Sequence, residues 1–148
     1  DPAFPAAAAR YAHLLIGQNK LQKAVEVIEA TWRRAPSPEL AEVYWQATGA
    51  TDALHKVRAA QDLARLNPEH EESRLAIAAA ALEARLWGEA RSNLEAAAGG
   101  EAPSPRVCRM MAALEEAENG DSAGARQWLL RASSPTTAAV TPTAPATA

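Results

Sequence analysis

Residues 86–97 read LWGEARSNLEAA and begin like a helix, but the stretch opens on a Trp-Gly pair. We expect Trp87 to pack in the turn between two antiparallel helices, where Gly88 allows close approach and Ala90 faces the partner helix. Leu94 continues this apolar face one turn further along. A single hairpin cannot bury both of its faces, so this interpretation requires neighbouring hairpins that stack on one another.

Prolines and weaker breaks divide the chain into segments of helical length. Pro36, Pro68, Pro103 and Pro135 are spaced by 32, 35 and 32 residues, and each ends the apolar run that precedes it. A weaker break splits each segment in two. The pattern predicts eight helices, over residues 5–17, 20–35, 38–48, 52–66, 71–84, 87–98, 104–118 and 121–132.

The composition favours an all-α fold. Alanine, the strongest helix former, contributes 38 of the 148 residues, whereas aromatic residues make up only 5%. The apolar–polar alternation that is typical of strands is absent from the sequence. A core with so few rings requires helix backbones that lie close together, with alanine at the contacts.

A period near 34 residues with two helices in each unit resembles the tetratricopeptide (TPR) repeats. Gly120-Asp121 followed by Ala125 resembles the turn and the small packing residue of that family, and Ala90 lies 35 residues before Ala125. Residues 66–68, Leu-Asn-Pro, resemble the Leu-Asp-Pro that closes such a repeat. The second unit departs from the pattern, because Lys56 or its neighbour His55 stands where alanine is expected.

The TPR resemblance implies a right-handed superhelix of about four stacked helix hairpins, an α-solenoid. The expected hairpins cover approximately residues 5–36, 37–68, 69–103 and 104–132, so that residues 1–132 form one repeat domain. Residues 133–148, rich in Pro, Thr and Ala, are expected to form a flexible tail. An irregular helical bundle is the alternative fold.

Three longer strings resemble the helical region of proteobacterial HemY proteins in loops as well as helices. They are DPAFPAAAARYAHLLIGQNKLQKAVEVIEATWRRAPSPELA at 1–41, LARLNPEHEESRLAIAAAALEARLWGEARSNLEAA at 63–97 and RVCRMMAALEEAENGDSAGARQWLLRA at 106–132. HemY proteins are membrane-anchored TPR proteins linked to haem biosynthesis. The resemblance implies a scaffold near the late steps of haem synthesis. It also implies an N-terminal anchor, missing from this chain, in the bacterial inner membrane, with this domain on the cytoplasmic side.

Several classes of chemistry find no pattern in the sequence. The net charge is −3 and the 15 basic residues are scattered, which argues against nucleic-acid binding. No run of about 18 apolar residues is present. The sequence contains no G-x-G-x-x-G flavin motif, nucleophile elbow or phosphate loop, so we expect a protein that is not an enzyme.

The three histidines and the single cysteine do not have metal-ligand spacing. His70 lies in a charged segment and is expected at a solvated helix start. Cys108 lies on an apolar helix face and is expected in the core. We expect no metal and no cofactor, with haem as the alternative if His13 or His55 serves as a ligand.

The surface that remains for function is the face of the first helix of each hairpin, which binds peptides or partner helices in helical-repeat proteins. The spacing of the matched turns places three pairs of residues 35 apart on this face, as an apolar strip edged by two carboxylates. Stacking between first helices is the alternative location for half of the set. The predicted partner-binding residues are His13, Trp45, Leu75 and Met110, Ala79 and Leu114, and Glu83 and Glu118.

These observations predict a non-enzymatic protein–protein interaction scaffold that holds a protein or peptide partner in a groove. Two rival functions stay open. One is a haem or porphyrin carrier with a histidine ligand and an apolar groove. The other is a periplasmic cytochrome-assembly module built on the same repeat.

Overall fold

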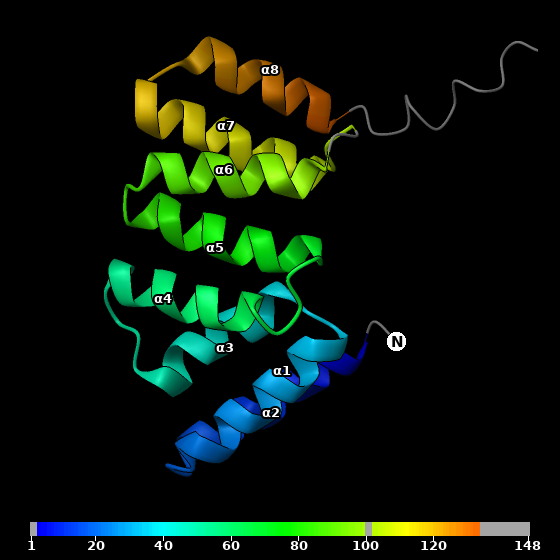
Figure 1. The fold of residues 1–148 in the computed structure, drawn as a ribbon, viewed down its shortest axis with the longest axis vertical. Coiled ribbons are helices and arrows are strands. Elements are labelled where there is room, and N and C mark those ends of the chain that lie inside the picture. Colours follow the sequence, from blue (N-terminus) through cyan, green and yellow to red (C-terminus); the bar gives the residue numbers. More distant parts are fainter. Residues whose placement is uncertain (1–2, 100–101, 134–148) are drawn as a thin grey trace, which may run out of the picture.

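The computed structural model describes residues 3–99 and 102–133, which form eight α-helices (Figure 1). No strand occurs in the described residues, so the all-α prediction is confirmed there. Each helix begins and ends within two residues of a predicted range. The predicted tail at 133–148 lies outside the described residues except for Ser133. The helices are α1 (Ala3–Gly17), α2 (Leu21–Arg34), α3 (Pro38–Thr48), α4 (Ala53–Ala64), α5 (Glu71–Glu83), α6 (Trp87–Ala98), α7 (Pro105–Asn119) and α8 (Ser122–Ala132).

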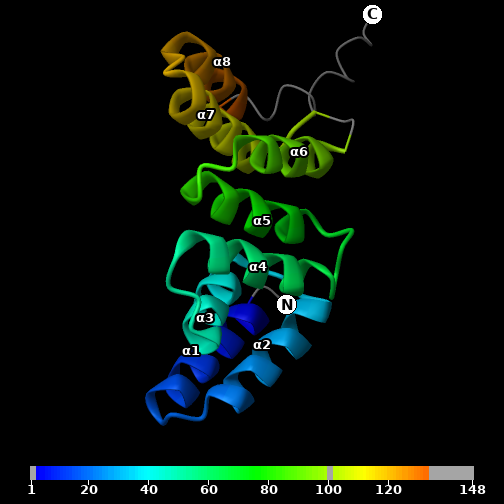
Figure 2. The same cartoon turned by 60° about the vertical axis from the view of Figure 1, so that its left-hand side comes forward.

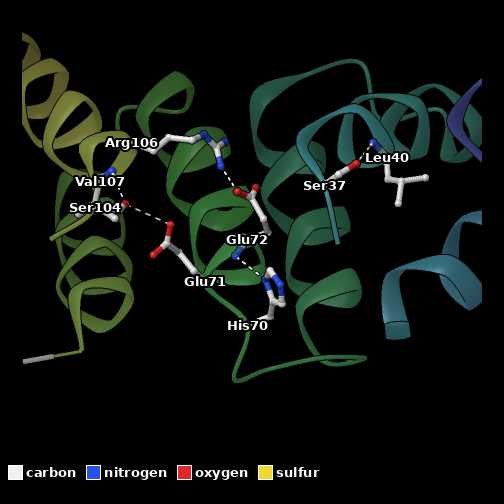
Figure 3. A network of polar contacts seen from close by, with 8 residues as sticks. All are labelled: Ser37, Leu40, His70, Glu71, Glu72, Ser104, Arg106 and Val107. Carbon is white, nitrogen blue, oxygen red and sulfur yellow. Dashed lines mark hydrogen bonds and ion pairs between the residues drawn. The ribbon is translucent and has the colours of Figure 1, made fainter. Parts of the chain in front are cut away.

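We call α1, α3, α5 and α7 the first helices and the other four the second helices. Three first helices begin with a side-chain cap (Figure 3). Oγ of Ser37 and Oγ of Ser104 each accept a hydrogen bond from the backbone N–H three residues later, and Nδ1 of His70 accepts one from the N–H of Glu72. These caps are 33 and 34 residues apart, so α3, α5 and α7 begin at repeat-equivalent positions.

One residue with a left-handed backbone lies in each connection between a first helix and the second helix that follows it. These residues are Asn19, Gly49, Arg85 and Gly120, with φ angles of 60°, 74°, 60° and 63°. Glycine takes this conformation without the steric cost that a side chain meets. Gly88 lies inside α6 instead, and a Cβ added there would meet no atom within 4 Å. The prediction that Gly88 allows close helix approach is therefore wrong.

Helices that are neighbours in the sequence pack against each other along the whole described chain (Figures 1 and 2). The first helices also contact one another in order, α1 with α3, α3 with α5, and α5 with α7. Both views show α4 to α8 as successive layers, with α1 and α2 at the opposite end of the molecule from α8. A stack of this kind brings first helices that are distant in sequence onto one side.

The contact between α3 and α4 is smaller than the contact within each of the other three helix pairs. Ala24, Ala90 and Ala125 are buried in the other second helices. Lys56 takes the equivalent place in α4, and 23% of its side chain is exposed. Because helix separation depends on the side chains at the contact, the long charged chain prevents the close packing that alanine permits elsewhere.

The buried apolar residues form two clusters that meet at α5. The first cluster joins α1 to α4, and the second joins α6 to α8. Because α5 is buried on two faces, it lacks the single apolar stripe of a surface helix. It contributes Ala76, Ile77 and Ala80 to the first cluster and Leu75, Ala78 and Ala81 to the second.

A buried polar network ties the end of α2 to the start of α5. Nε1–H of Trp32 donates to Oγ of Ser73 at 3.0 Å, and Ser73 donates in turn to the carbonyl of Asn67 at 2.7 Å. The side-chain amide of Asn67 donates back to the carbonyl of Arg33 at 3.2 Å. Trp32 and Ser73 are both fully buried, so this network satisfies polar groups that water cannot reach.

Crossing a bilayer needs about 20 apolar residues in one helix. The longest helices, α1 and α7, have 15 residues each. No helix within residues 3–99 and 102–133 has the length and apolar character to span a membrane.

Candidate functional site

A cavity of about 260 Å³ lies between α3, α5 and α7, and we call it the α3–α5–α7 cavity. Four of the predicted partner-binding residues line it together. They are Trp45 of α3 and Leu75, Ala79 and Glu83 of α5. The structure therefore brings together half of the predicted set, from two first helices that are adjacent in the stack.

Small side chains leave the space for this cavity. Ala41 of α3 and Ala76 and Ala79 of α5 line it. Ala41 and Ala76 are buried, while Ala79 is half-buried. A larger side chain at position 79 would extend into the space that these alanines leave open.

Trp45 forms an aromatic wall that a cation already contacts. Nζ of Lys56 lies 5.3 Å from the centre of the Trp45 ring, and the same ammonium donates to Oε2 of Glu83 at 3.1 Å. Trp45 is half-buried, and its Nε1 is shielded from solvent without an acceptor among the described residues. The site therefore combines an aromatic face, a carboxylate and an indole donor that no group of the described chain satisfies.

Arg106 of α7 reaches the cavity from the other side and pairs with Glu72 of α5 (Figure 3). Burial raises the pKa of Glu72 above its ordinary value, and the Arg106 guanidinium offsets part of that rise. Next to this pair, the hydroxyl of Ser104 donates to Oε2 of Glu71 at 3.2 Å. These contacts join the beginnings of α5 and α7 and fix the position of Arg106 at the cavity wall.

Glu42 of α3 is the third carboxylate of the cavity. It also lines a neighbouring hollow of about 450 Å³, which Trp45 and Lys56 line too. Glu42 is exposed, and it makes no hydrogen bond or ion pair in the part of the chain that the structure describes. It is therefore a free carboxylate beside an aromatic ring.

Two ion pairs repeat along the stack with a spacing of 35 residues. Lys56 of α4 pairs with Glu83 of α5 at 3.1 Å, and Arg91 of α6 pairs with Glu118 of α7 at 2.9 Å. The hydrogen bond to Glu118 raises the pKa of Arg91 above its ordinary value. Each pair joins a second helix to the C-terminal end of the next first helix, so Glu83 and Glu118 have the same structural role.

The remaining predicted residues do not line the α3–α5–α7 cavity. Met110 is half-buried and packs against the second apolar cluster. Leu114 is completely buried in that cluster, so it belongs to the core and a partner cannot reach it. Glu118 is held by Arg91. His13 lies at a different hollow, between α1 and α3.

That second hollow, which we call the α1–α3 hollow, has a volume of about 530 Å³ and mostly apolar walls. Leu14 and Val43 line it, together with His13 and Arg10 of α1. Leu14 is 62% exposed, and His13 is exposed as well. The hollow lies on the first helices but at the N-terminal end of the stack.

The other residues considered for chemistry have structural surroundings. The backbone N–H of His55 donates to Asp52 and holds the pKa of Asp52 below its ordinary value, and Nδ1 of His55 lies 2.6 Å from Oδ2. His70 caps α5, as expected of a helix start, and Cys108 is buried, as expected of a core residue. No group of three His, Cys, Asp or Glu side chains suited to a metal occurs within residues 3–99 and 102–133.

Sequence reasoning missed the charged part of the site. Glu42, Glu72 and Arg106 were not singled out, because they lie on three helices whose relative positions the sequence does not reveal. Lys56 carried a signal, since it interrupts the alanine pattern of the second helices. An ionisable residue at a position that is otherwise small and apolar indicates a local change in packing.

The chain is 30% identical over 111 residues to the probable magnetosome protein Mms48 of Magnetospirillum gryphiswaldense. The match covers 73% of this chain and 24% of that protein, so the chain spans about a quarter of the length of this relative. No family model and no solved structure matches the chain.

Proposed function

We propose that this protein is a non-enzymatic interaction scaffold, a TPR-like α-solenoid of about four hairpins whose first helices hold a peptide or partner helix. The α3–α5–α7 cavity is the centre of the binding face. The observation that carries the proposal is that Trp45, Leu75, Ala79 and Glu83 line one cavity. Their positions follow from a repeat spacing that also predicts their common face.

The arrangement of the helices supports the repeat. First helices contact each other in order, and each second helix contacts the first helix that follows it. The caps at Ser37, His70 and Ser104 and the ion pairs of Glu83 and Glu118 recur at 33 to 35 residues. An irregular bundle gives no reason for contacts that repeat with the period of the sequence.

Selection of short random peptides displayed on phage against the immobilised protein tests this proposal. We expect selected peptides to bind the wild-type protein and to lose affinity for Ala79→Met, which fills the cavity. Ala96→Met makes the same change on the exposed surface of α6 and serves as the control. The proposal is wrong if no peptide is selected, or if Ala79→Met binds every selected peptide as tightly as Ala96→Met does.

A haem or porphyrin carrier is the second candidate, and the α1–α3 hollow favours it. The hollow has apolar walls, an exposed imidazole at His13 as a possible axial ligand, and Arg10 to pair with a propionate. Its volume of about 530 Å³ is within the range of small-molecule sites, about 300–1,000 Å³. An absorbance titration with haemin tests the idea. A bound-haem band that persists in His13→Ala as it does in the control His70→Ala rules out this ligand.

For the cellular setting we propose the bacterial inner membrane near late haem synthesis, through an anchor outside this chain. Similarity to HemY proteins over residues 1–132 supports this setting. The relative described as a probable magnetosome protein supports a different setting, association with magnetosomes. Co-sedimentation of the purified protein with isolated magnetosomes, and separately with inner-membrane vesicles, distinguishes the two settings.

A further inference from the structure

We propose that the α3–α5–α7 cavity receives a lysine or arginine side chain of the partner, which pairs with Glu42 beside the aromatic wall of Trp45. This inference rests on the proposed function and specifies the partner's chemistry at that face. It draws on the charges of the lining, on the contacts of Lys56, and on the size of the cavity.

The lining carries one negative charge in excess. Its carboxylates are Glu42, Glu72 and Glu83, and two cations compensate two of them: Arg106 pairs with Glu72, and Lys56 pairs with Glu83. Glu42 has no such partner in the described ranges. A basic side chain completes this charge balance. An acidic side chain would bring a carboxylate close to Glu42, and like charges oppose binding.

Lys56 provides an internal example of the same chemistry. Its ammonium lies between the ring of Trp45, at 5.3 Å from the centre, and the carboxylate of Glu83, at 3.1 Å. An ammonium gains both from an aromatic face and from a charge-assisted hydrogen bond. On the cavity side, the same ring has Glu42 as the carboxylate beside it. The partner's cation would therefore occupy a second position of the same kind.

The cavity has the size of a side chain rather than of a separate ligand. Its volume of about 260 Å³ lies below the range of about 300–1,000 Å³ that is typical of small-molecule sites. Buried Ala41, Leu75 and Ala76 offer an apolar surface to a long hydrocarbon stem, while Glu42 is exposed. Lysine and arginine combine such a stem with a charged end that stays near water.

The peptides selected against the wild-type protein provide the first measurement. We expect them to share a lysine or arginine at one position. Exchange of that residue for norleucine keeps the stem and removes the charge. We expect this exchange to raise the Kd, measured by fluorescence anisotropy, by about tenfold, as for loss of one charge-assisted contact.

Variants of the protein provide the second measurement, because two changes should act in opposite directions. Glu42→Gln should weaken binding about fivefold or more, whereas Lys56→Gln should strengthen it, since it frees the Trp45 ring and Glu83. Glu26→Gln and Lys23→Gln make the same charge changes on exposed positions of α2. We expect these two controls to stay within about twofold of the wild type, because salt screens distant charges.

The outcomes separate this inference from the proposed function. If peptides are selected but share no basic residue, or if norleucine binds as well as lysine, the inference is wrong and the interaction scaffold stands. If no peptide is selected, both fail. If Glu42→Gln and Glu26→Gln weaken binding equally, only the overall negative charge attracts the peptide, and the cavity is not the basic-residue site.

Discussion

Trp32 is the largest fully buried side chain of the described residues, and its stability depends on one hydroxyl. Its indole N–H donates to Oγ of Ser73, which lies 41 residues later in the chain. A buried donor that loses its acceptor has no water to replace it. Ser73 is therefore more important for folding than its small size suggests, although the sequence offers no motif that marks it.

Ser73→Ala should lower the free energy of unfolding by about 1–3 kcal/mol, because it leaves the Trp32 N–H unpaired in the core. Urea denaturation followed by circular dichroism measures this change. Ser92→Ala on the exposed surface of α6 is the control and should change stability by less than about 0.5 kcal/mol. Equal midpoints for the two variants would contradict the proposed importance of the network.

Arg106 and Glu72 give a prediction about pH. Burial raises the pKa of Glu72, so the folded protein binds more protons than the unfolded chain between the unfolded and folded pKa values. The contribution of Glu72 to the free energy of unfolding therefore falls as pH rises through this interval. Arg106→Gln removes the cation that limits the shift, and the pKa of Glu72 should rise further.

Arg106→Gln should therefore destabilise the protein more at pH 7 than at pH 4. We expect a loss of about 1 kcal/mol at pH 7, a small value because a third of the arginine side chain is exposed. Arg109→Gln changes an exposed arginine on the same helix and is the matched control. A loss that is independent of pH would show that Arg106 acts through packing rather than through the Glu72 carboxylate.

Helix ends were the most predictable elements, because their signals are local. Prolines, serine caps and alanine-rich runs are read directly from the chain, so the eight ranges could be predicted closely. The opening of α3 from α4 depends on Lys56 and its distant partner Glu83, which no local pattern contains. The turn before α6 was misread because Gly88 drew attention away from Arg85, the residue with φ of 60°.

The two glycines Gly88 and Gly120 should respond to alanine in opposite ways. Gly88 lies in α6 with free space around it, so Gly88→Ala should stabilise the protein by about 0.4–1 kcal/mol. Gly120 has a φ of 63°, so Gly120→Ala should destabilise it by about 1–2 kcal/mol. Thermal and urea unfolding of both variants measure the signs. Destabilisation by Gly88→Ala would restore a packing role for Gly88.

Across the whole molecule, the repeat period predicted which first-helix residues could share a face, and the 35-residue spacing linked Glu83 to Glu118. It did not predict depth. Leu114 is buried and Ala79 is accessible although they are repeat-equivalent, because the cavity opens between α3 and α5 and not at the next level. Such differences arise from how far each pair of helices lies apart, which depends on contacts between distant residues.

The central claim is that a partner binds at the α3–α5–α7 cavity, and the indole signals of the four tryptophans test it most directly. A titration of the ¹⁵N-labelled protein with a selected lysine-containing peptide should shift the Nε1–H signal of Trp45, which Trp45→Phe assigns. The signal of Trp32, buried away from this face, should stay in place. A bound peptide that leaves the Trp45 signal unchanged while shifting that of Trp87 or Trp128 would contradict the account.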